Sequence, residues 1–368
     1  MIVTDRTMIE LDYVESLRVS LASVGMESKV FSETIPEPTA ASIEAGVNML
    51  RDGNFDSIIA LGGGSPIDSA KAISIVGKYG GHIRDYKYPR DVEEHGLPII
   101  AIPTTSGTGS EATRFTIITD ESSDEKMLCA GIGFMPVAAI IDHSLTLTLP
   151  ARTTADCGLD ALTHAIEAYV SRRANAFSDS QALIAMKLIG KNLRTAFNSP
   201  ANENARESMM LGSTLAGIAF SNSSVALVHG MSRPIGALFH IPHGLSNAML
   251  LPAITEFSIK GNEKRYADCA RAIGVATNKD SDQTACDQLV AELHLLNKDL
   301  KVPTLKEYGI EGKNFISSIP VMAKQALASG SPANNPRSAS AQEIADLYKA
   351  VWQLGATQPD AIYCVNNE

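Results

Sequence analysis

Gly158-Leu-Asp-Ala-Leu-Thr-His-Ala-Ile-Glu-Ala-Tyr169 is the stretch of sequence around which the rest of the chain is organised. Apolar residues surround a row of polar ones, a pattern that predicts a buried helix with one polar side. Asp160 and His164 are four positions apart, so their side chains lie one turn apart on the same face. Glu167 and Ser171 continue this row. A buried carboxylate and imidazole at this spacing form either a structural hydrogen-bonded pair, the commoner case, or half of a metal site.

The composition predicts a soluble protein with two domains. The chain has 368 residues, of which 45% are hydrophobic and 20% are charged, and this length suits two cores better than one. The sequence has no apolar run of about 18 residues, so no membrane span is expected. Its first residues lack the basic-then-apolar pattern of a secretory signal.

Charge and cysteine usage exclude further classes. The formal net charge is −10 and no basic stripe occurs, which argues against nucleic acid as a partner. The five cysteines are scattered, without a Cys-x-x-Cys pair. Neither a disulfide framework nor a thiolate zinc site is therefore expected, and a cytoplasmic location fits best.

Residues 1–149 alternate between strand and helix patterns. Strands are predicted over 1–5, 28–32, 56–62, 97–103 and 138–142, and helices over 11–24 and 39–51. The run 56–62 is continuously apolar, as in a strand covered on both faces. This alternation predicts an α/β domain built on a doubly wound parallel sheet.

A glycine-rich turn, Gly62-Gly-Gly-Ser-Pro-Ile-Asp68, follows the strand over 56–62. Without β-carbons at three positions, backbone amides can approach an anion closely at the start of the next helix. The plainer interpretation is a tight turn before a well-capped helix, with Pro66 at its first position and Ser65 and Asp68 as a capping box. The turn matches neither Gly-x-Gly-x-x-Gly nor a Walker loop. Its place at the carboxyl end of a strand favours phosphate binding.

A second polar turn, Thr104-Thr-Ser-Gly-Thr-Gly-Ser-Glu111, follows the strand over 97–103. Such a turn can equally be an ordinary loop. Two turns at successive strand ends would line one crevice, and this favours a shared ligand. Lys126 lies on the next strand-like segment.

From Pro150 onward the sequence predicts helices only. They are expected over 181–193, 205–219, 225–240, 245–251, 266–273, 282–296 and 341–352, forming an all-α domain over 150–368. The tail over 355–368 has no periodicity and is expected to be flexible.

Three of the eight histidines lie close together in this second half, at His229, His240 and His243. Ile241-Pro242 should end one helix, so that His243 opens the next and the chain turns back. His229 and His243 could then meet Asp160 and His164. One carboxylate and three imidazoles suit Fe²⁺, Zn²⁺, Mn²⁺ or Ni²⁺.

The motifs quoted above, together with His229-Gly-Met and Pro242-His-Gly244, resemble those of the iron-containing (group III) alcohol dehydrogenases. The resemblance implies a dinucleotide-binding α/β domain followed by an all-α domain that carries Fe²⁺ on Asp160, His164, His229 and His243. It implies a cofactor site whose residues are Asp5, Gly63, Gly64, Ser65, Asp68, Thr104, Thr105, Thr108 and Lys126. Asp5 matches an acid placed on the adenosine ribose, which favours NAD over NADP. The implied reaction is reversible hydride transfer between a small alcohol or aldehyde and NAD, in a homo-oligomer of two or more chains.

Three features depart from the family pattern. Members carry about one more strand hairpin before the segment that Ile2-Val-Thr-Asp5 matches. Either the start of the chain is misassigned, or the cofactor domain and any dimer contact through that hairpin are altered. Arg233 stands where many members have a proton-relaying histidine. Arginine cannot be a general acid near neutral pH, but it can bind a carboxylate or phosphate of a substrate, and His240 is the alternative relay. Glu37 stands where members often have Asn.

Other activities share this architecture. Glycerol-type polyol dehydrogenases typically use zinc with fewer histidines, and dehydroquinate synthase has a different basic substrate site. A metal-free maleylacetate reductase is disfavoured by the complete ligand set. A non-catalytic NAD-binding relative is the alternative from another class, and turnover of short alcohols would distinguish it.

Overall fold

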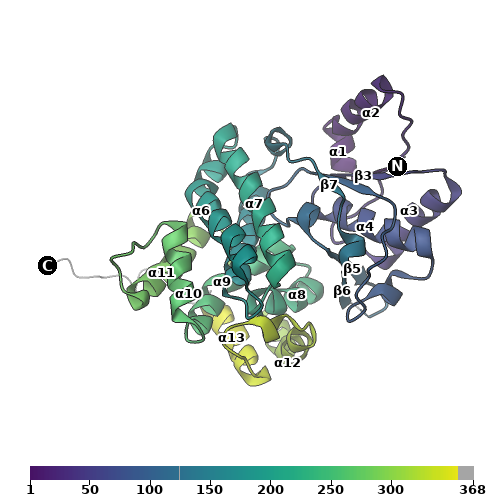
Figure 1. The fold of residues 1–368 in the computed structure, drawn as a ribbon. Helices are drawn as coiled ribbons and strands as arrows, with labels where there is room; N and C mark the ends of the chain where they lie inside the picture. Colours follow the sequence, from purple (N-terminus) through teal and green to yellow (C-terminus); the bar gives the residue numbers. More distant parts are fainter. Residues whose placement is uncertain (124, 355–368) are drawn as a thin grey trace.

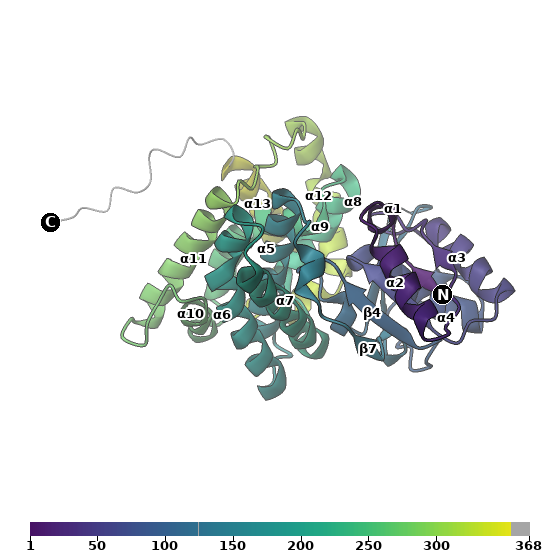
Figure 2. The ribbon, with the colours of Figure 1, turned by 90° about the horizontal axis from the view of Figure 1, so that it is seen from above.

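The computed structural model describes residues 1–123 and 125–354. A sheet-containing part is followed by a larger helical part, and both views show the two side by side (Figures 1 and 2). The tail over 355–368, which the sequence predicts to be flexible, lies outside the described residues.

Five parallel strands form the sheet of the first part, in the order β2-β1-β3-β4-β7. All residues of β3 are buried, as expected for a strand covered on both faces. The predicted α/β fold with a parallel sheet is confirmed. The strands are β1 (Ile2–Val3), β2 (Val30–Phe31), β3 (Ile58–Gly62), β4 (Ile99–Pro103) and β7 (Ala138–Ala139).

The helices of this part differ in detail from the prediction. They are α1 (Arg6–Glu10), α2 (Tyr13–Ser23), α3 (Ala40–Asp52) and α4 (Gly64–Tyr79). The helix predicted over 11–24 begins only at Tyr13, because Asp12 adopts left-handed backbone with φ 62° and separates α1 from α2. The capping box predicted for Ser65 and Asp68 is wrong: α4 begins at Gly64 after Gly63, and Pro66 is its third residue.

The register of β3 and β4 brings the two polar turns together. Gly62 pairs with Pro103, so both chains leave the sheet at the same edge. Beyond them, the antiparallel pair β5 (Phe115–Asp120) and β6 (Glu125–Ala130) places Thr119 opposite Lys126. The strand around Lys126 was expected, but its partner β5 was not.

The second part is helical throughout, as predicted. Its helices are α5 (Ala151–Val170), α6 (Ala176–Asn198), α7 (Glu203–Ser223), α8 (Leu227–Phe239), α9 (His243–Ile259), α10 (Glu263–Ile273), α11 (Asp282–Asp299), α12 (Gly312–Ala328) and α13 (Ala341–Leu354). Helix α12 was not predicted. It contains Pro320, a residue that disfavours helix, yet the buried Phe315, Ile319 and Met322 hold it in the core.

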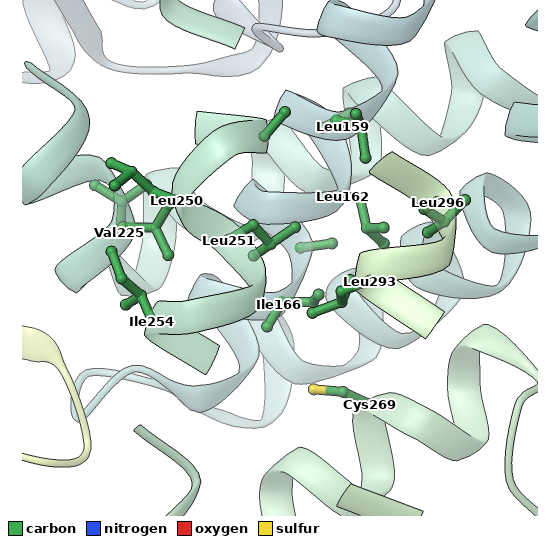
Figure 3. Packing of buried hydrophobic residues seen from close by; sticks show 14 of the residues in the cluster. Leu159, Leu162, Ile166, Val225, Leu250, Leu251, Ile254, Cys269, Leu293 and Leu296 are labelled. Atoms are coloured by element: carbon green, nitrogen blue, oxygen red, sulfur yellow. The ribbon is translucent and has the colours of Figure 1, made fainter. Parts of the chain in front are cut away.

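Helix α5 lies within the apolar core of this part. Figure 3 shows its Leu159, Leu162 and Ile166 among leucines of α9 and α11, including Leu251 and Leu293. Burying each such side chain contributes about 1.5–3 kcal/mol. This packing fixes the rotation of α5, and it therefore fixes where the polar row on the same helix points.

Within the described ranges, no single helix is long and apolar enough to cross a membrane, and only the pair α7 and α8, bent by 105°, reaches the required length and composition.

Candidate metal and cofactor site

Four side chains from three helices converge in the helical part. Asp160 and His164 lie one turn apart on α5, His229 lies on α8, and His243 is the first residue of α9. Their potential ligand atoms all lie within 4.8 Å of one another. The structure therefore brings together the whole predicted ligand set.

The turn between α8 and α9 makes this convergence possible. Helix α8 ends at Phe239, and His240 takes left-handed backbone with φ 52°. Ile241 and Pro242 follow, and α9 starts immediately after them. The predicted helix break is thus confirmed, and it points His243 back toward α5.

The spacing of the donor atoms fits a bound cation. Oδ1 of Asp160 lies 3.8 Å from Nε2 of His164, 3.5 Å from Nε2 of His229 and 3.8 Å from Nε2 of His243. These separations exceed ordinary hydrogen-bond lengths. They approach the roughly 3.4 Å expected between ligands that lie about 2.1 Å from a tetrahedral metal ion. The donor set also suits Fe²⁺ or Zn²⁺ chemically.

The protonation states of this cluster favour metal binding. Burial lowers the pKa of His164 to about 4, although Asp160 opposes the shift. Burial also lowers the pKa of His243. For Asp160, burial alone would raise the pKa, but the three imidazoles outweigh it and hold the pKa below its ordinary value. At neutral pH Asp160 is therefore a carboxylate and the imidazoles of His164 and His243 are neutral, the forms that bind a metal ion.

Glu167 orients one of the ligands. Its carboxylate accepts hydrogen bonds from Nδ1 of His229 at 2.6 Å and from the amides of Ala226 and Val228 at 2.9 and 2.6 Å. Burial lowers the pKa of His229, but Glu167 and Asp160 outweigh this effect and the pKa is raised. With Nδ1 held by Glu167, Nε2 is left to face Asp160. Sequence reasoning noted Glu167 in the polar row but assigned it no role; its place on the same face as the ligands was the available signal.

A cleft of about 240 Å³ connects the ligands to the end of the sheet. Two phenylalanines, Phe115 and Phe220, form part of its wall. The ring of Phe220 stacks on the ring of His164, with 4.3 Å between centroids, and on the ring of Phe115, with 6.1 Å between centroids. The predicted site residues that line the cleft are Gly64, Ser65, Asp68, Thr108, Lys126, Asp160, His164, His229, Arg233 and His243. The predicted residues Asp5, Gly63, Thr104, Thr105 and His240 lie outside its lining.

The glycines of the first turn are required by packing as well as by any ligand. Gly62 has φ 145°, a backbone conformation that residues with a side chain rarely adopt. A β-carbon at Gly63 would lie 3.2 Å from Thr105, and one at Gly64 would lie 2.7 Å from Thr108. The two turns are thus in close contact, and Gly64 and Ser65 at the start of α4 line the cleft beside Thr108.

Two predicted cofactor residues have structural contacts. Asp68 is half-buried and accepts hydrogen bonds from the hydroxyl of Ser110 at 2.5 Å and the amide of Ile117 at 3.0 Å. Asp5 caps α1 by accepting from the amide of Met8 at 3.1 Å. Its Oδ2 also lies 3.5 Å from where a β-carbon on Gly62 would stand, so it remains beside the glycine turn.

Lys126 and Glu37 form an ion pair at the cleft. Their Nζ and Oε1 atoms are 2.6 Å apart, and only 8% of the Lys126 side chain is exposed. The amide of Glu37 donates to the hydroxyl of Ser65, which ties the pair to the glycine turn. Glu37, which stands where family members often have Asn, therefore links the glycine-rich turn to Lys126 of β6.

Arg233 and His240 have different positions. Arg233 lines the cleft, and its Nη1 donates to the hydroxyl of Ser331 at 3.3 Å. No carboxylate among residues 1–123 and 125–354 lies within 4.0 Å of its guanidinium. His240 is exposed at the end of α8, its carbonyl accepts a hydrogen bond from the hydroxyl of Tyr308, and it belongs neither to the four-residue cluster nor to the cleft lining. The structure therefore does not bring His240 to the site.

Known proteins and protein families match this chain over both of its parts. A family model described as "Iron-containing alcohol dehydrogenase" matches residues 1–143, and "Fe-containing alcohol dehydrogenase family, C-terminal" matches residues 154–352. The NADPH-dependent butanol dehydrogenase of Clostridium saccharobutylicum is 36% identical over 94% of this chain and 89% of its own length.

Two solved structures are similar in fold. A 1,3-propanediol oxidoreductase has a TM-score of 0.90 at 34% identity, over 95% of this chain and 91% of its own. The sulfoacetaldehyde reductase of Bifidobacterium kashiwanohense, solved with NAD⁺, has a TM-score of 0.84 at 30% identity, over 95% of this chain and 90% of its own. With matching profiles over both parts, relatives above 30% identity and a complete ligand cluster, the chain belongs to the iron-containing alcohol dehydrogenase family.

Proposed function

We propose that this chain is a metal-dependent alcohol dehydrogenase and aldehyde reductase that transfers hydride reversibly between a small alcohol and NAD, with Fe²⁺ held by Asp160, His164, His229 and His243. One observation carries the proposal. The four ligands line the same cleft as the turn at Gly64, so metal and cofactor sites face each other.

Different residues of the cleft have different roles in the proposed reaction. When bound, a divalent metal ion supplies Lewis acidity, worth several kcal/mol toward charge developing on a substrate oxygen. The amides at the start of α4 suit the cofactor pyrophosphate. Phe115 and Phe220 give the cleft between these sites an apolar wall, and Glu167 keeps Nε2 of His229 directed toward Asp160.

The cofactor assignment rests on Asp5. Its carboxylate lies beside the glycine turn, where it would accept a hydrogen bond from a ribose hydroxyl and repel the 2′-phosphate of NADP. The test is turnover of short alcohols by anaerobically purified protein with each cofactor. NAD⁺ should support turnover with the higher kcat/KM, and Asp5→Gly should reduce this preference. No turnover with either cofactor would favour a non-catalytic relative.

We further propose that the substrate carries a carboxylate, phosphate or similar anion. Arg233 lines the cleft one turn beyond His229 and has no acidic partner among the described residues. A half-buried guanidinium whose side-chain hydrogen bond among the described residues goes to a hydroxyl is suited to bind a substrate anion bidentately. One relative of similar fold is a sulfoacetaldehyde reductase, whose named substrate also bears an anionic group.

Replacing Arg233 tests this substrate class. Arg233→Leu should lower kcat/KM for a carboxylated aldehyde by about 10- to 100-fold, the cost of losing a charge-assisted hydrogen bond. Butanal should change much less, and Arg233→Lys should retain part of the preference. An equal loss on both aldehydes would contradict the proposed role.

The remaining proposals concern assembly and organisation. We propose domains over 1–149 and 150–368, a cytoplasmic location and a homo-oligomer, such as a dimer. The exposed apolar residues Val137, Ile140 and Ile141, which flank the edge strand β7, support self-association. Light scattering of purified protein should give at least twice the mass of one chain, and a monomer would contradict this.

A further inference from the structure

Asn247 is buried beside the ligands and does not line the cleft. It lies on α9, one turn after His243, with none of its surface exposed, and it is absent from the cleft lining. Its Nδ2 lies 2.6 Å from Oδ1 of Asp160, 3.1 Å from Nε2 of His229 and 3.3 Å from Nε2 of His243. All three partners are atoms that would bind the metal.

The number of hydrogen bonds that each of these atoms can make shows which contacts of Asn247 are compatible with a bound metal ion. An amide NH₂ group has two donors, and three acceptors surround it here. A neutral imidazole nitrogen has one lone pair, so a hydrogen bond from Asn247 and a bond to a cation exclude each other. A carboxylate oxygen has two lone pairs and can accept from Asn247 while it also binds a metal ion.

The carbonyl oxygen of the same side chain supports this view. Oδ1 of Asn247 is buried and has no hydrogen-bond partner among the described residues. An unsatisfied buried acceptor costs free energy, so the orientation of the amide is set by what Nδ2 contacts. In this structure the amide N–H groups stand in for the positive charge that the ligand atoms converge upon.

We propose that Asn247 is a positioning residue of the metal site. Before metal binds, its amide satisfies Asp160 and the imidazoles of His229 and His243 and keeps the four ligands gathered. After metal binds, the contacts to the imidazoles are released, and the hydrogen bond to Asp160 remains to orient the ligating oxygen. This inference rests on the proposed metal function.

Two substitutions should act in opposite directions. Asn247→Leu has a similar volume but no donors, so Zn²⁺ and Fe²⁺ should bind about 10- to 100-fold more weakly, as when other partners of metal ligands are removed. Asn247→Asp places a second carboxylate beside Asp160. The metal-free protein should then be less stable, and added metal should raise Tm by more than it does in the wild type, because the cation relieves the repulsion.

Asn297 provides the matched control. It also has a buried carbonyl oxygen without a partner, and its Nδ2 donates to the carbonyl of Ala248, next to Asn247 in sequence. It contacts none of the four ligands, so Asn297→Leu should change the stability of the metal-free protein but leave metal affinity unchanged.

The experiment measures affinity and unfolding of chelator-treated protein under anaerobic conditions. Zn²⁺ and Fe²⁺ affinities come from competition with a chromophoric chelator, and Tm is measured with and without each metal. The inference predicts weaker binding for Asn247→Leu and a larger metal-induced rise in Tm for Asn247→Asp. Wild-type affinity in Asn247→Leu, or an unchanged rise in Tm for Asn247→Asp, would overturn it. If Asn247→Leu does not fold, the Asn247→Asp result decides. Failure of the wild type to bind either metal would instead refute the proposed metal function.

Discussion

The two sides of the cleft are built by different means. On the sheet side, Gly64 presents only backbone to the cleft, and side chains beside it hold one turn against the other, as Asp68 does with Ser110. On the helical side, the surface is made of side chains whose directions are set by helix packing, and all four point to one centre. A backbone site should tolerate side-chain changes that do not alter the turn, whereas the side-chain site should fail when a single ligand is lost.

The largest effect is expected on the helical side. Asp160→Ala removes the ligand that all three imidazoles face, so turnover should fall by about 1000-fold or more, as expected when several kcal/mol of Lewis-acid stabilisation is lost. Metal content of the purified protein should fall with it. If the variant kept its metal but lost turnover, Asp160 would be needed for turnover but not for holding the metal, and the contrast drawn between the two sides of the cleft would be weakened.

Loss of the partner of a ligand should have the next largest effect. Glu167→Gln keeps the shape of the side chain but replaces a charged acceptor for His229 with an amide. Metal affinity should fall by about 10- to 100-fold. Chelator competition measures this change, and an affinity equal to that of the wild type would show that α8 packing alone orients His229.

On the sheet side, the corresponding test adds one methyl group. Gly64→Ala brings a β-carbon within 2.7 Å of Thr108 and should raise KM for NAD⁺ by about tenfold, with metal content unchanged. Thr108→Gly, combined with Gly64→Ala, removes the clash and should restore part of the affinity. A double variant as impaired as the single one would mean that the methyl group obstructs the cofactor rather than the second turn.

Lys71 is a buried cation next to these turns, and its ionisation should affect the free energy of unfolding rather than turnover. Lys71 donates to Ser110, Thr113 and the carbonyl of Phe115, and burial lowers its pKa to about 8. Between pH 8 and its ordinary pKa of 10.5, the unfolded chain holds a proton that the folded chain has lost, so stability rises with pH in this window.

Urea unfolding of Lys71→Met at several pH values tests that window. The stability of the wild type relative to the variant should increase by about 2 kcal/mol from pH 8 to pH 10. A difference that stays constant or falls with pH would show that Lys71 keeps its ordinary pKa in the folded state.

The smallest effect is expected at His240. Its side chain is exposed at the end of α8, and Asn also tolerates left-handed backbone there. His240→Asn should therefore change kcat by less than about twofold. A loss of tenfold or more, with a shifted pH profile, would restore the proton relay predicted from sequence.

The contrast between the helical side and the sheet side of the cleft also explains which features could be predicted from the sequence. Helical spacing fixes direction, so Asp160 and His164 at i, i+4 and a proline-induced break before His243 were enough to predict the ligand set. In turns, the same residue types serve packing and binding alike, so only the family resemblance placed Asp68 and Thr105 in the cofactor site, and the sequence did not predict their packing contacts. The roles of Glu167 and Asn247 depend on how α5, α8 and α9 pack, which spacing within one helix does not encode.

Metal analysis of anaerobically purified protein tests the central claim most directly, when it is combined with NAD⁺-dependent oxidation of a short alcohol. The account predicts stoichiometric iron, loss of turnover on chelation and recovery on addition of Fe²⁺. Zinc in place of iron would indicate a polyol-type enzyme. Full turnover by protein that contains no metal would contradict the role assigned to Asp160, His164, His229 and His243.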